Sequence, residues 1–99
     1  MKPFYLYILR CADDSLYIGH TDDLPARMQQ HDSGELGGYT AMRHPLTLVY
    51  ASEHETRLEA LERERQIKRW SRAKKEALIA GDWEGLRRLA VGAWGRPKE

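Results

Sequence analysis

Two short apolar runs that contain tyrosine lie on either side of an acidic turn near the start of the chain. Residues 4–11 and 15–19 are rich in residues that favour β-strands, and Asp13-Asp14-Ser15 between them is typical of a hairpin turn. If the loop has three residues, Cys11 faces Ser15 and odd-numbered residues pair with odd-numbered residues. One face of the hairpin would then carry four residues: Tyr7, Leu9, Tyr17 and Gly19.

Helix signals follow the hairpin. The segment Asp22-Asp23-Leu24-Pro25 is typical of a helix start. An aspartate carboxylate there accepts hydrogen bonds from the free N–H groups of the first turn, and proline has no N–H that would need a partner. The helix is expected to end at about Asp32, with Gly34 as its stop. Residues 33–45 contain three glycines and a proline, and we expect them to form a loop.

The rest of the chain reads as one strand and three helices. The expected elements are a strand over 46–51, a helix over 55–70, a helix from Ser71 to Ala80 closed by Gly81, and a short helix over 82–90 before a tail at 95–99. The order β-β-α-β-α-α predicts an α/β fold, in which helices pack a small three-stranded sheet. We expect a single domain over residues 1–99, with its core at about 4–80 and a C-terminal helix and tail at 82–99.

Composition limits the classes of protein that the chain can belong to. Its 99 residues carry a net charge of +1, so the total charge indicates no particular partner. The one cysteine, Cys11, excludes an intramolecular disulfide framework and fits a reducing cytoplasm. No signal peptide and no membrane-spanning run is visible, so we expect a cytoplasmic protein that does not bind a membrane.

A carboxylate interrupts the apolar face of the helix expected over 55–70. At 100° per residue, Ala60, Leu61 and Ile67 form an apolar stripe, and Glu64 lies in the middle of it. A charge on an inward face is costly unless it is paired. One interpretation is an ion pair with Lys68, four residues further on.

The other interpretation of Glu64 depends on its neighbours. Residues 63–75 contain seven basic side chains and Glu64 as the single acid, a composition that attracts phosphate but is also common on solvated helix faces. A lone carboxylate in a basic field suits a divalent cation bound at a phosphate. The first helix offers Arg27, suited to phosphate charge, and His31, which can move a proton near neutral pH. On pattern alone they could equally be a surface arginine and a helix-end cation.

No zinc-ligand spacing, phosphate-binding glycine loop or serine nucleophile motif is present. The ordered set of motifs over about residues 4–80 instead resembles the GIY-YIG nuclease domain, in its small stand-alone bacterial branch. The residues that carry this resemblance are Tyr5-Leu6-Tyr7, Tyr17-Ile18-Gly19, Thr21 to Arg27 with His31, Gly38-Tyr39-Thr40, Pro45-Leu46, Leu48-Val49-Tyr50, and Glu64 with Ile67-Lys68-Arg69-Trp70.

The resemblance implies a sandwich around a three-stranded antiparallel sheet. It also implies hydrolysis of phosphodiesters that depends on Mg²⁺ or Mn²⁺, with DNA as the expected nucleic-acid substrate. By position it implies a catalytic set of Tyr7, Tyr17, Arg27, His31 and Glu64, with Glu64 as the metal ligand. One phenol would orient or deprotonate the attacking water, and the sequence does not decide which. Nucleic-acid contacts are expected from Gly19, Tyr39, Thr40, Arg43, His44, Lys68 and Arg69.

The chain departs from the family pattern at three positions. Tyr5 replaces the first glycine of the first motif, Asp32 stands where an amide is expected, and Ala41 stands where a basic residue is expected. The missing positive charge at position 41 lowers the affinity that we expect for the phosphates of the substrate. Binding without a second DNA-binding domain is expected to be salt-sensitive, unless a homodimer or protein partner adds surface.

Three functions remain open at this level. The first is a metal-dependent endonuclease, structure-selective or acting in DNA repair or processing. The second is a non-catalytic nucleic-acid-binding or adaptor module on the same fold. The third is a protein-interaction domain with Trp83 and Trp94 as anchors. Glu64 separates the first from the second, because a carboxylate inside a basic run repels phosphate unless a cation lies between them.

Overall fold

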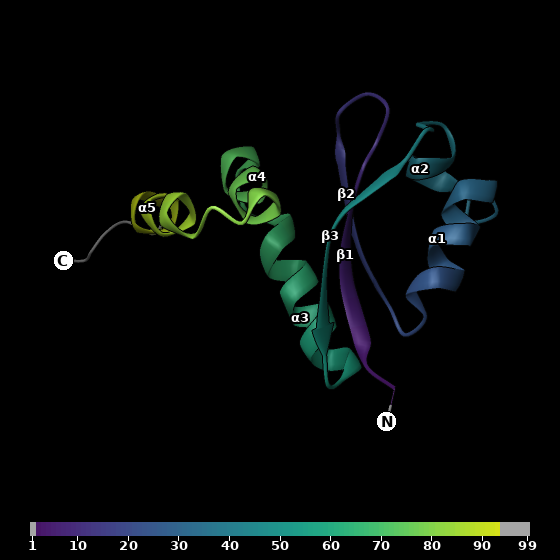
Figure 1. Ribbon diagram of the computed structural model, residues 1–99, viewed down its shortest axis with the longest axis horizontal. Helices are drawn as coiled ribbons and strands as arrows, with labels where there is room; N and C mark the ends of the chain where they lie inside the picture. The colour runs from purple at the N-terminus through teal and green to yellow at the C-terminus, as the bar shows by residue number, and fades with distance from the viewer. Residues whose placement is uncertain (1, 94–99) are drawn as a thin grey trace. The chain divides into compact units, whose positions relative to one another are not determined.

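The computed structural model describes residues 2–93, with side chains as far as residue 89. The chain forms two compact units, which meet in the sequence between Lys68 and Arg69. The first unit contains β1 (Phe4–Arg10), β2 (Leu16–Thr21), α1 (Leu24–Ser33), α2 (Gly38–Ala41), β3 (Thr47–His54) and α3 (Arg57–Lys68), and the second contains α4 (Arg72–Ala80) and α5 (Trp83–Ala93) (Figure 1). The predicted α/β fold is confirmed. Over the described residues, no helix is both long and apolar enough to cross a bilayer.

The sheet is antiparallel and has the strand order β2-β1-β3, so β1 lies in the centre. The N–H of Cys11 donates to the carbonyl of Ser15 at 2.9 Å, which closes the three-residue turn that the sequence predicts. The register pairs Leu9 with Tyr17 and Tyr7 with Gly19, so the predicted shared face is confirmed. The third strand is longer than predicted and extends to His54.

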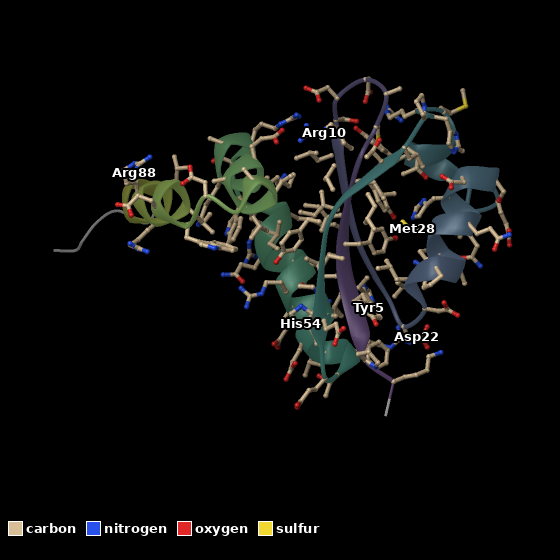
Figure 2. All side chains as sticks on the ribbon, viewed as in Figure 1. Tyr5, Arg10, Asp22, Met28, His54 and Arg88 are labelled. Carbon is tan, nitrogen blue, oxygen red and sulfur yellow. The ribbon has the colours of Figure 1, made fainter. Side chains whose placement is uncertain are left out.

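Helices cover both faces of the sheet in the first unit. Figure 1 shows α1 and α2 on one side of the strands and α3 on the other. As a result, four consecutive residues of β1, residues 6–9, are buried, because side chains of both parities face a helix layer. Met28 points from α1 toward the sheet (Figure 2), where with Leu9 it lines a cavity of about 110 Å³.

Local signals determine where α1 begins and ends. The carboxylate of Asp23 accepts from the N–H of Ala26 at 3.2 Å, and Pro25 occupies the first turn. Gly34 ends the helix in the left-handed conformation, with φ 77°, which glycine adopts without steric cost. The predicted start and stop of this helix are therefore confirmed.

The segment predicted to be a loop contains a short helix. α2 occupies Gly38–Ala41, and it follows two glycines with positive φ, Gly37 and Gly38. The prediction was wrong at these four residues because glycine is a poor helix former, whereas here the contacts of Thr40 with α1 stabilise the turn.

The second unit consists of two helices joined at a glycine. Ser71 caps α4, accepting from the N–H of Lys74 at 3.2 Å, and Gly81 ends it with φ 71°, as the sequence predicts. α5 runs to Ala93, three residues beyond its predicted end at 90. The carboxylate of Asp82 accepts from the N–H of Gly85 at 2.9 Å and so caps α5.

Candidate active site

The side chain of Tyr7 crosses the sheet toward the edge strand β2. Tyr7 is completely buried, and its hydroxyl lies over Gly19, its partner in the register. A β-carbon at position 19 would be 2.6 Å from that hydroxyl. Gly19 thus leaves room for a phenol of the same protein. Gly19 is expected to allow close approach of backbone or substrate, and the structure shows that its lack of a β-carbon makes room for Tyr7.

A chain of hydrogen bonds joins Tyr7 to α1 and α2. The hydroxyl of Tyr7 lies 2.9 Å from Nε2 of His31, and Nδ1 of His31 lies 2.9 Å from Oγ1 of Thr40. His31 is only 2% exposed, so it is not the surface cation at a helix end that was left open above. A neutral imidazole donates through one nitrogen and accepts through the other, and both hydroxyls can take either role. The ring therefore links the hydroxyls of Tyr7 and Thr40 in one hydrogen-bonded chain.

Thr40 lies behind His31 and not at the surface. It is 3% exposed, and its hydroxyl is bonded to His31. The Thr40 hydroxyl therefore faces His31 and is not placed to donate to a phosphate at the surface. Its contacts make it a positioning residue for the imidazole.

The electrostatic surroundings of Tyr7 contain the other predicted catalytic groups. Burial raises the pKa of Tyr7, and Tyr17 and Glu64 raise it further, whereas a contact with the Arg27 guanidinium opposes the shift. Burial also lowers the pKa of His31, and the charge of Arg27 adds to this effect. Tyr7 therefore stays protonated and His31 stays neutral at pH 7. Tyr17, Arg27 and Glu64 all influence the pKa of Tyr7, with Glu64 having the smallest effect.

Tyr17 lies between the buried site and the surface. Its ring centroid is 6.4 Å from that of Tyr7, 5.3 Å from that of His31 and 6.3 Å from that of Tyr39. Unlike Tyr7, Tyr17 is only partly buried. Of the two predicted phenols, Tyr17 is therefore the one that can meet a solvent molecule.

Arg27 reaches β2 from α1. Its Nε donates to Oε1 of Gln30 at 3.2 Å, and its Nη1 donates to the backbone carbonyl of His20 at 3.4 Å. The first bond orients the guanidinium along the helix, and the second brings it to the exposed border of the sheet. This placement, beside Tyr7, leaves further N–H donors of the guanidinium for a phosphate.

Glu64 approaches the same border from α3. It is 9% exposed, with Oε1 at 2.6 Å from Nδ1 of His20 and Oε2 at 2.6 Å from Nζ of Lys68. The ion pair with Lys68 considered above is therefore present. Burial acts to raise the pKa of Glu64, but hydrogen bonds from Lys68 and His20 outweigh it, and the net pKa is lowered. Glu64 is thus an ionised carboxylate held in place by two donors.

His20 is a residue that the sequence reasoning missed. It pairs with Leu6 in the register, so its side chain lies on the sheet face opposite to Tyr7. Its ring binds Glu64 and its carbonyl accepts from Arg27, so β2 joins groups from both helix layers. The strand pattern could have placed His20 on the face that Glu64 meets, but only the packing of α3 shows that the two side chains touch.

The Glu64 carboxylate suits a hard divalent cation, but it would have to share that cation with ligands from outside the protein. Within residues 2–89, no group of three or more His, Cys, Asp or Glu side chains could hold a metal ion. A cation at Glu64 would therefore need ligands from substrate and water, as is common for Mg²⁺. Lys68 shares one oxygen of Glu64, but its side chain is 53% exposed and long enough to turn away. The donor set fits a cation that binds together with a phosphate.

The other predicted contact residues differ in their exposure and in their local contacts. Tyr39 is 43% exposed, and the Arg43 guanidinium lies 3.7 Å over its ring. His44 contacts α1, with its Nε2 at 2.6 Å from the backbone carbonyl of His31. Arg69 is exposed and follows α3. For the protein-interaction reading, Trp83 is 58% exposed and Trp94 lies outside the described residues.

A three-stranded antiparallel sheet with helices on both faces is the fold that the sequence motifs led us to expect of a GIY-YIG domain. The pattern described as the GIY-YIG catalytic domain matches residues 3–77. The chain belongs to the GIY-YIG family. This is a nuclease superfamily, so membership suggests endonuclease activity and implies a nucleic-acid substrate.

Relatives place the chain among small members of that family. It is 44% identical over 79 residues to UPF0213 proteins of Staphylococcus aureus, in strains Mu3 and N315, covering 80% of this chain and 96% of the relative. A solution structure of a UPF0213 protein from Bacillus halodurans is similar, with a TM-score of 0.54 and 38% identity over 84% of this chain and 92% of that one. A solution structure from E. faecalis has a TM-score of 0.55 and 27% identity, covering 100% and 95%.

Proposed function

We propose that the protein is a metal-dependent endonuclease that hydrolyses DNA phosphodiester bonds, in the repair or processing of DNA in the cytoplasm. The observation that supports this most is that Arg27 of α1 and Glu64 of α3 both bind His20 of β2, the strand that also carries Tyr17 and lies beside Tyr7 of β1. A purely structural core has no need to collect a guanidinium and a carboxylate around a phenol, because charges are costly to bury.

Tyr17 is the residue that we assign to the attacking water. Tyr7 is completely buried and its hydroxyl is bonded to His31, whereas Tyr17 is partly exposed. Water would attack phosphorus as the bond from phosphorus to the leaving oxygen breaks, with the Tyr17 hydroxyl orienting the water. Tyr7 and His31 would hold the Tyr17 ring from behind, since both rings lie against it.

Arg27 and Glu64 would deal with charge. The guanidinium of Arg27 would donate to the phosphate oxygens as negative charge builds on them. Glu64 would hold a Mg²⁺ or Mn²⁺ ion, with Lys68 displaced into solvent. When bound, such an ion polarises the phosphate and stabilises the leaving oxygen. The lowered pKa of Glu64 keeps the carboxylate ionised, as a metal ligand must be.

A cleavage assay on labelled duplex, branched and single-stranded DNA, with Mg²⁺ or with EDTA, tests this proposal. We expect Mg²⁺-dependent products from the wild type, and a rate at least a hundredfold lower, about the effect of removing one charge-stabilising group, for Glu64→Gln and for Arg27→Ala. Glu62→Gln and Gln29→Ala change exposed residues on the same two helices and serve as controls. Equal cleavage by Glu64→Gln and the wild type would overturn the proposal.

A non-catalytic nucleic-acid-binding module is the second candidate. One observation favours it: both oxygens of Glu64 already have cationic or N–H partners, as in a structural ion pair. This candidate predicts binding without cutting. Its affinity would fall steeply between about 50 and 200 mM salt, because cations are released from the phosphates on binding.

A further inference from the structure

The rings around the site continue outward as a stack that ends in an arginine. The Tyr39 ring lies against Tyr17 with centroids 6.3 Å apart and planes 26° apart. On Tyr39 lies the Arg43 guanidinium, with Cζ at 3.7 Å from the ring centroid. Tyr39 is 43% exposed and the Arg43 side chain 34%, so the stack leads from the buried site to the surface.

Hydrogen bonds fix the plane of the Arg43 guanidinium. Its Nη1 donates to the carbonyl of Tyr39 at 2.8 Å, and its Nε donates to Oδ2 of Asp13 in the hairpin turn at 3.1 Å. The backbone supports this contact, since the N–H of Ala12 donates to the carbonyl of Arg43 at 2.9 Å. The guanidinium is therefore held over the ring by hydrogen bonds to two separate segments of the chain.

The pairing with Asp13 changes what Arg43 can offer to a nucleic acid. A carboxylate beside the guanidinium offsets much of the charge that would attract a phosphate. The flat surface of the guanidinium is unaffected, and unpaired bases stack on aromatic rings and on arginine planes alike. Among the nucleic-acid contacts expected of Tyr39 and Arg43, the structure thus favours one with a base over one with a phosphate.

We propose that Tyr39 and Arg43 form a platform on which an unpaired nucleobase stacks, close to the phosphate that is cut. This inference rests on the proposed function and names its substrate class: nucleic acid with an unpaired nucleotide near the scissile bond. The platform is one ring away from Tyr17, so the stacked base would belong to a nucleotide beside the reacting phosphate. A base inside a regular duplex has both faces covered by its neighbours and cannot use it.

A binding experiment in EDTA isolates recognition from cutting. The probes are a fully paired duplex and the same duplex with one unpaired 2-aminopurine, whose fluorescence falls when it stacks. For the wild type we expect quenching and a preference for the unpaired probe of about fivefold to a hundredfold, the range for one stacked base. Tyr39→Leu should abolish both the quenching and the preference for the unpaired probe, while its affinity for the paired duplex changes less than twofold. Tyr39→Phe keeps the ring and should retain the quenching and the preference.

Arg43→Lys separates stacking from charge, because it keeps the positive charge but removes the flat group. We expect it to weaken the preference for the unpaired probe, and Met42→Ala, at an 86% exposed neighbour, to leave it unchanged. Unquenched 2-aminopurine with the wild type, or full preference in Arg43→Lys, would overturn the platform. Cleavage of paired and unpaired DNA at equal rates would reject the platform but keep the nuclease, and stacking without Mg²⁺-dependent cleavage would do the reverse.

Discussion

The hydroxyl of Tyr7 occupies the place where a side chain at position 19 would begin. Only glycine fits there, because a β-carbon would lie 2.6 Å from the hydroxyl oxygen and 2.8 Å from the ring carbon that bears it. The glycine of the second motif and the tyrosine of the first are therefore one steric unit in this protein. Each is constrained by the other, although twelve positions separate them in the chain.

Gly19→Ala should destabilise the protein by about 1–3 kcal/mol, the usual cost of overpacking a closed core. Chemical denaturation of Gly19→Ala, Tyr7→Phe and the double variant tests the cause. Tyr7→Phe removes the nearest atom, so the alanine should cost less in that background than in the wild type. Strictly additive free energies of unfolding would show that this contact is not the reason.

Thr40→Val should leave Nδ1 of His31 without its partner in a buried place. The expected loss is about 1–3 kcal/mol in the free energy of unfolding, since an unsatisfied buried polar group has lost its water as well. Thr40→Ser keeps the hydroxyl and should restore most of the stability. If valine and serine behave alike at this position, the hydrogen bond contributes little.

His31 predicts a loss of stability in mildly acid solution. Burial and the charges of Arg27 and His44 lower its pKa below the usual 6.5, and Asp32 opposes them only in part. The unfolded chain then binds more protons than the folded one, so this contribution is complete above pH 6.5 and is lost as the pH falls. Urea denaturation from pH 8 to pH 5 measures the free energy of unfolding at each pH. We expect this free energy to fall less steeply with decreasing pH in His31→Gln than in the wild type. A wild type whose stability is constant over this range would contradict it.

His20→Ala should impair the site although the residue belongs to no recognised motif. Glu64 would lose the donor on Oε1, and we expect about a tenfold or larger rise in the Mg²⁺ concentration needed for half-maximal cleavage. His20→Asn offers an N–H at a similar distance from the backbone and should recover part of the effect. His54→Ala, at the end of β3, is the control. Unchanged Mg²⁺ dependence in His20→Ala would show that the hydrogen bond does not position Glu64.

Local chemistry made much of the fold predictable. The turn at 12–14 sets the register that places Tyr7 and Tyr17 on one face, and Asp23, Gly34 and Gly81 mark helix ends through interactions within a few residues. α2 was missed because its stability comes from contacts with α1 and not from the propensity of its own residues. A prediction from local sequence fails in this way wherever tertiary packing overrides the local preference of the residues.

For the site, the sequence identified Glu64 as a misplaced charge but could not identify its partner on β2. The two residues are 44 positions apart, and their contact depends on how α3 lies on the sheet. Likewise, nothing in the pattern distinguishes Thr40, which faces inward to His31, from Tyr39, which faces outward. Helix orientation in a segment of four residues decides that difference.

The position of β2 at the border of the sheet determines how a polymer can arrive. Groups from the two helix layers converge there over a strand that has a neighbour on one side only. A long flexible molecule can lie along such a rim and be held in mid-chain, with both of its ends trailing free. Within the first unit, such a bound polymer needs no free end at the site, which suits the cutting of internal bonds that we propose.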